Sequence, residues 1–79
     1  MSNTAALTHR QRRMIASLNS AAAQADNYGK LAAIAAEMAG MEYEADRLTR
    51  TAAEMEAEAE SIRDALIGEG VTPEQAETA

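Results

Sequence analysis

The 79-residue sequence contains no cysteine, phenylalanine or tryptophan, and has one proline and four glycines. The absence of cysteine excludes disulfides and thiolate metal sites, and the single histidine, His9, cannot build a zinc site without several carboxylates. Twenty residues are alanine and only two are aromatic, a composition that favours helices over strands. We therefore expect an all-α protein.

Two further absences bear on assembly and location. A chain this short buries only about 60% of its unfolded surface, and it lacks disulfide or metal staples, so oligomerisation is the remaining way to stabilise it. We expect a homo-oligomer, either a dimer or a larger assembly. No cationic start precedes a long apolar run, and no stretch approaches the roughly 18 apolar residues of a membrane span. The sequence thus predicts a cytoplasmic protein without membrane contact.

The strongest positive signal is a repeat of apolar residues at alternating steps of three and four. This spacing keeps one stripe of a helix facing a partner, as in coiled coils. It predicts a long helix that packs against other helices. The repeat comprises Leu31, Ile34, Met38, Met41, Ala45, Leu48, Ala52, Met55, Ala59, Ile62 and Leu66.

A shorter helix is expected before the repeat. Thr8 and Gln11 have the spacing of a capping box, so a helix should start there. Asn27–Gly29 is the preferred break, because Asn and Gly tolerate positive φ and the repeat changes phase there. Gly40 is a second candidate for the turn, and one continuous helix is a third reading.

The predicted fold is an antiparallel helical hairpin that assembles into a coiled-coil-like bundle. Its parts are a flexible N-terminus (1–7), a hairpin domain (8–67) and an acidic flexible tail (68–79). The first helix, 8–27, spans about 28 Å and the second, 30–67, about 55 Å at 1.5 Å per residue. The second helix therefore overhangs the first. We expect a second subunit to cover the overhang, at Ala52, Met55, Ala59, Ile62 and Leu66.

Charge is unevenly distributed along the chain. The net charge is −6; residues 8–30 carry four cations and one acid, and residues 31–67 three cations and nine acids. In the expected hairpin, three arginines near the start lie close to Glu42, Glu44 and Asp46. This complementarity favours antiparallel packing.

The same basic segment is the main candidate binding site. A helix N-terminus and bidentate arginines can hold a phosphate, and a neighbouring Tyr can stack on a ligand or anchor a protein. The alternative is that these side chains are solvated or paired with acids of the second helix. Nucleic acid is an unlikely partner because the rest of the chain is acidic. The candidate residues are Arg10, Arg12, Arg13, Tyr28, Lys30 and Tyr43.

Catalysis is not expected. The chain has no nucleophile and base arrangement, phosphate loop or cofactor motif, and the carboxylates at 54–60 lack histidine partners for a metal site. The predicted function is therefore binding. The first hypothesis is a small protein-interaction module or inhibitor, of the kind that a mobile element can encode and direct at a host protein. The alternatives are an oligomer that binds a nucleotide or other anion, and a structural coiled-coil spacer.

Overall fold

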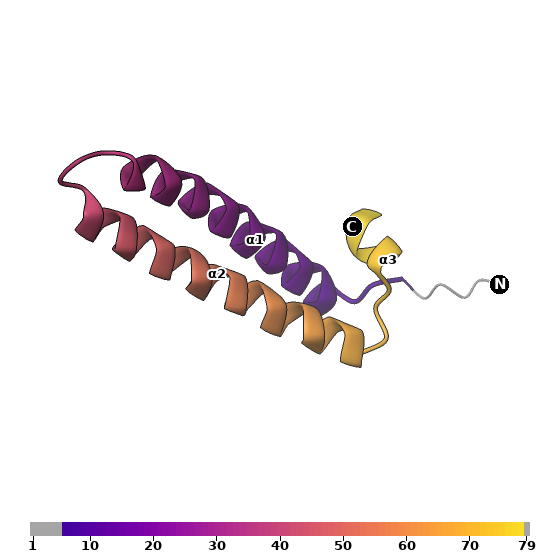
Figure 1. The fold of residues 1–79 in the computed structure, drawn as a ribbon. Coiled ribbons are helices and arrows are strands. Elements are labelled where there is room, and N and C mark those ends of the chain that lie inside the picture. Colours follow the sequence, from indigo (N-terminus) through magenta and orange to yellow (C-terminus); the bar gives the residue numbers. More distant parts are fainter. Residues whose placement is uncertain (1–5, 79) are drawn as a thin grey trace.

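In a computed structural model, which describes residues 6–78, the chain forms two long helices and a short third one (Figure 1). Helix α1 comprises His9–Ala36, α2 comprises Glu42–Gly68, and α3 comprises Pro73–Thr78. Helices α1 and α2 lie side by side and antiparallel, and α3 lies at the end opposite the turn. We call that end the open end and the other the turn end. The all-α helical hairpin is confirmed.

The start of α1 follows the predicted capping box. The Thr8 hydroxyl accepts a hydrogen bond from the Gln11 backbone N–H, and the Gln11 side chain accepts one from the Thr8 N–H, each at 3.0 Å. These bonds satisfy two donors that a helix start leaves unpaired.

The turn lies at Gly40, so the preferred turn at Asn27–Gly29 is wrong. Gly40 has φ +87°, and the N–H of Met41 donates to the Met38 carbonyl at 3.2 Å across the turn. Asn27 and Gly29 are inside α1. A helical glycine costs only about 1 kcal/mol relative to alanine, and burial of Ala32 and Ala35 beyond it keeps the helix continuous.

The prediction of a short first helix and a long second helix is also wrong. With the turn at Gly40, α1 has 28 residues and α2 has 27. The two helices can cover each other along their full length, and the expected overhang does not exist. The described chain is a rod with extents of 58 × 17 × 15 Å.

Helix α2 ends at a glycine-rich segment, residues 68–70. The N–H of Val71 donates to the Leu66 carbonyl at 3.0 Å, and that of Gly70 to the Ile67 carbonyl at 2.9 Å. Gly70 has φ +88°. This is a Schellman motif, in which the residue after the glycine usually makes an apolar contact with the last turn. Val71 and Leu66 are both buried in one apolar cluster.

The tail forms more structure than a flexible segment would. The Thr72 hydroxyl accepts from the Gln75 N–H at 3.2 Å, and the Gln75 side chain accepts from the Thr72 N–H at 2.8 Å. With Pro73 in the first helical position, this second capping box starts α3. Ala76 of α3 packs against the apolar cluster. Residues 1–5, the greater part of the predicted flexible N-terminus, lie outside the described residues.

The core is thickest at the open end. One cluster joins both long helices and the segment before α3, and Leu7, Met14, Ile62 and Ala76 pack against it. Toward the turn only Ala32 and Ala35 of α1 are buried. Within residues 6–78, no helix combines the length and hydropathy needed to cross a membrane. The cluster comprises Ile15, Leu18, Ala21, Ala59, Leu66 and Val71.

Candidate interaction surfaces

Helix α1 carries two stripes of residues with the same three and four spacing. The inner stripe faces α2 and is buried or half-buried: Met14, Leu18, Ala21, Ala25, Tyr28, Ala32 and Ala35. The outer stripe consists of the residues that directly precede the last four members of the inner stripe: Gln24, Asn27, Leu31 and Ile34. Met38, in the turn, continues the outer stripe with the same spacing. One residue rotates a helix by about 100°. The outer stripe therefore points away from α2.

Large apolar side chains of the outer stripe face solvent at the turn end. Leu31 is 42% exposed, Ile34 58% and Met38 51%. These three residues begin the repeat that runs from Leu31 to Leu66 in the sequence. They belong to the outer stripe of α1, whereas the repeat from Met41 onward faces α1 from α2. The repeat thus crosses from one surface of the hairpin to the other at the turn.

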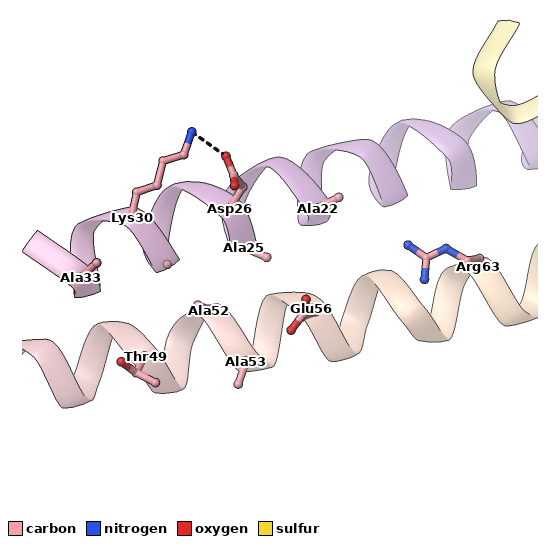
Figure 2. A pocket seen from close by; sticks show the side chains of 11 residues that line it. Ala22, Ala25, Asp26, Lys30, Ala33, Thr49, Ala52, Ala53, Glu56 and Arg63 are labelled. Atoms are coloured by element: carbon pink, nitrogen blue, oxygen red, sulfur yellow. Dashed lines mark ion pairs between the residues drawn. The ribbon is translucent and has the colours of Figure 1, made fainter.

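A shallow groove runs along another side of the hairpin (Figure 2). Its floor consists of small side chains from both helices, and an exposed ion pair at its edge joins the Lys30 ammonium to the Asp26 carboxylate at 3.0 Å. The groove is open to solvent along its length and does not enclose a ligand. Its other lining residues are Ala22, Ala25, Gly29, Ala33, Thr49, Ala52, Ala53, Glu56 and Arg63.

Arg10 belongs to a clasp that joins the two long helices at the open end. Its guanidinium pairs with the Glu69 carboxylate at 2.5 Å, and the Gln11 amide donates to the same carboxylate at 3.1 Å. The hydrogen bonds from Arg10, then Gln11, lower the pKa of Glu69, against a smaller opposing effect of desolvation. The predicted pairing of this basic segment with residues 42–46 is wrong, because the turn position sets a different register. Glu44 and Asp46 instead pair with Arg47 and Arg50 on their own helix.

One chain does not bring the other predicted binding residues together. Arg12 and Arg13 are exposed in the first turns of α1. Lys30 lies about 27 Å along the same helix from Arg12, at 1.5 Å per residue. Tyr28, predicted at the turn, is half-buried on the inner stripe, and Tyr43 is 71% exposed in the first turn of α2.

The predicted subunit interface is an intrachain contact surface. Ala59 and Leu66 are each only 3% exposed, and Ile62 packs against the same cluster. Ala52 and Met55 are half-buried. Residues of α1 cover Ala59, Ile62 and Leu66 within the chain, so these three do not await a second chain.

Helix α2 differs from α1 in the charge of its solvent-facing side. Glu54, Glu56, Glu58 and Glu60 are all exposed, and no ion pair involves them in the described part of the chain. By contrast, α1 has no charged residue from Met14 to Ala25. The hairpin therefore has an acidic helix and a helix whose middle segment is uncharged.

Two of the predicted binding residues, Arg10 and Arg13, line one open hollow at the open end together with Ser17. No three His, Asp or Glu side chains among residues 6–78 gather closely enough to hold a metal ion. The described side chains include no buried polar atom without a hydrogen-bond partner.

Comparison with known proteins adds no family and no relative. No family model matches the chain, and no significantly similar curated protein or solved structure was found. The candidate surfaces therefore stand on the geometry of this chain alone.

Sequence reasoning missed the two features that define these surfaces. The outer stripe could have been found by continuing the first-helix spacing from Tyr28 to Ala32 and Ala35, which leaves Leu31 and Ile34 on another face. The Glu69 clasp had no comparable signal. It depends on a register that only the turn position fixes.

Proposed function

We propose that this chain is a non-enzymatic protein-interaction module that works as a homo-oligomer. The observation that carries the proposal is the exposure of Leu31, Ile34 and Met38 at the turn end. Adjacent large apolar side chains on a surface are typical of sites that bind another protein. A hairpin with a thin core also gains stability from association, because binding to the folded state shifts the folding equilibrium.

The acidic side of α2 supports a second, heterologous contact. The exposed carboxylates from Glu54 to Glu60 lie on both flanks of the outward side of α2, Glu54 with Glu58 and Glu56 with Glu60, because alternate helical residues differ by about 200°. Together they give this side a negative potential that a basic partner protein can recognise. In this proposal the outer stripe of α1 serves assembly and the acidic side of α2 serves partner binding. Such a module inhibits its partner when it covers a functional surface, or acts as an adaptor when it does not.

The proposal is tested by retention of proteins from an extract of the native cell on the immobilised chain. Wild type should retain a defined protein that elutes with rising salt, since exposed charge pairs are screened. The double variant Glu54→Gln/Glu58→Gln should retain at least several-fold less.

A matched control, Glu42→Gln/Glu77→Gln, removes two charges outside the acidic segment and should retain as much as wild type. Equal retention by both double variants would remove the acidic side from the proposal. Retention no greater than that of an unrelated helical hairpin would contradict the proposed function.

A further inference from the structure

The outer stripe of α1 has a charge pattern that specifies what can cover it. Leu31 and Ile34 form its apolar centre, and Lys30 and Glu37 lie along one flank, in the positions that border a coiled-coil seam. The other flank is formed by Tyr28 and Ala35, which belong to the inner stripe. The charge beside the stripe is therefore on one side, where Asp26 lies one turn before Lys30 and pairs with it.

We propose that the outer stripe binds the outer stripe of a second copy of this chain, with the two α1 helices antiparallel. This inference rests on the proposed function and identifies a second copy of the chain as the partner of the outer stripe. The two-fold axis passes between Ala32 and Ala33, so Leu31 of each copy lies against Ile34 of the other. Met38 of each copy then covers the edge of the contact beside Asn27 of the other.

Charge complementarity selects the antiparallel arrangement. In an antiparallel pair, flanking residues on the same side of the two seams face each other, so Lys30 of each copy faces Glu37 of the other. In a parallel pair, each flank faces the opposite flank of the other helix, so Lys30 and Glu37 would lie beside the uncharged Tyr28 and Ala35 and form no ion pair.

The same pattern favours a second copy over an unrelated helix. A two-fold contact requires a self-complementary surface, in which residue i contacts residue j and residue j contacts residue i. One flank that carries both Lys30 and Glu37 meets this requirement without any other chain.

Both charged side chains are available for the contact. Among residues 6–78, Lys30 pairs only with Asp26 of its own helix, at 3.0 Å, and the two side chains are 73% and 68% exposed. An ammonium has three donors and can bind a second carboxylate. Glu37 is exposed at the end of α1 and makes no ion pair with any other described residue.

The overlap of the two α1 helices is confined to the turn end. With the axis between Ala32 and Ala33, Gly29 of one copy lies level with Ala36, the last residue of α1, in the other. The two acidic α2 helices lie on the outside. The dimer therefore keeps both acidic sides available for the heterologous contact.

The test is the mass of the purified full-length chain, measured by analytical ultracentrifugation over a concentration series. The 8.4 kDa chain should approach twice its mass as concentration rises. Ile34→Ser should raise the dissociation constant at least tenfold. The matched control is Ile67→Ser, because Ile67 is 59% exposed at the open end and Ile34 is 58% exposed at the turn end. Ile67→Ser should dimerise like wild type.

The charge register is tested with Lys30→Glu and Glu37→Lys as separate chains. Each variant alone has only like charges across the seam and should dimerise less than wild type. An equimolar mixture should form heterodimers more tightly than either variant pairs with itself, because every flanking pair then becomes attractive. Far-UV circular dichroism at the same concentrations checks that each variant remains helical.

A wild-type chain that stays monomeric at all concentrations would overturn the inference. So would a dimer that tolerates Ile34→Ser, a loss of dimer in Ile67→Ser alone, or a mixture no tighter than its components. A monomeric chain that still retains a partner whose binding depends on Glu54 and Glu58 would contradict the homo-oligomer and leave the heterologous contact of the proposed function standing. A dimer that retains no partner would support the inference and contradict the heterologous part of the function.

Discussion

The two ends of the hairpin use large apolar residues in opposite ways. At the open end, Ile15, Leu18 and Leu66 are buried together with Val71, which the Schellman turn directs onto the cluster. At the turn end, alanines are buried and Leu31 and Ile34 are exposed. One end is therefore completed by its own chain, whereas the other leaves apolar surface available to a second molecule.

Because of this difference, the residues that stabilise the fold lie at the open end, and the residues available for association lie at the turn end. Large buried side chains supply most of the folding free energy, at about 0.8 kcal/mol for each buried CH₂ group. Alanines contribute less but permit close approach of the two helices. Substitutions at the open end should therefore change folding, and equivalent substitutions at the turn end should change association.

The largest contrast is expected between two isoleucines. Ile15 is 2% exposed and Ile34 is 58% exposed. Ile15→Ala should lower the free energy of unfolding by about 2–5 kcal/mol, because it leaves a cavity in the core. Ile34→Ala should change it by less than about 0.5 kcal/mol in dilute solution, as is usual for surface sites.

Urea unfolding followed by circular dichroism measures both values. If Ile15→Ala does not fold, Ile15→Val supplies a milder test with an expected loss of about 0.5–1.5 kcal/mol. Equal losses at positions 15 and 34 would show that the two ends do not differ as described.

A smaller effect is expected at the segment that closes the open end. Val71 is 8% exposed, and its side chain belongs to the same cluster as Leu66. Val71→Ala should cost about 1–2 kcal/mol, from the loss of two buried methyl groups. Thermal unfolding measures it, with Ile67→Ala, at an exposed neighbouring site, as the control. A Val71→Ala protein as stable as the control would mean that the tail does not complete the core.

The smallest effect is expected at the Glu69 clasp, and it depends on pH. The pKa of Glu69 is lowered from 4.5 in the folded chain, mainly by hydrogen bonding to Arg10. The folded state therefore binds this proton less readily than the unfolded state. The contribution to stability is present above pH 4.5 and is lost as the pH falls from there through the lowered pKa.

Glu69→Gln should accordingly be slightly less stable than wild type at pH 7, and the difference should shrink in acid. The control is Glu77→Gln, an exposed site for which the pH dependence should match wild type. Urea unfolding at a series of pH values measures this. A Glu69→Gln difference that is constant from pH 7 to pH 3 would contradict the role of the carboxylate.

A local signal in the sequence predicted the capping box at the start of α1, because it depends on residues only three positions apart. The helical class followed from composition. The turn did not, because Gly29 and Gly40 have similar local signals and tertiary packing decides between them. Burial of Ala32 and Ala35 against α2 outweighs the cost of a helical glycine.

The predicted surfaces failed for a related reason. A repeat with one spacing predicts one face of one helix. In the structure, however, its first three members lie on α1 or in the turn, and the others lie on α2 or just before it. Placing the turn eleven residues too early also moved Arg10 from Glu69 to residues 42–46. Errors of register reassign every contact along a hairpin, even when the helices themselves are correct.

The most direct test of the account compares two glycine substitutions in the same unfolding experiment. A Cβ atom would meet no atom within 4 Å at either Gly29 or Gly40, so the backbone conformation alone decides the outcome. Gly29→Ala should stabilise the chain by up to about 1 kcal/mol, because position 29 is helical. Gly40→Ala should destabilise it by about 1–2 kcal/mol, because position 40 has φ +87°. The opposite signs would place the turn at position 29 and contradict the hairpin, its outer stripe and the dimer built on it.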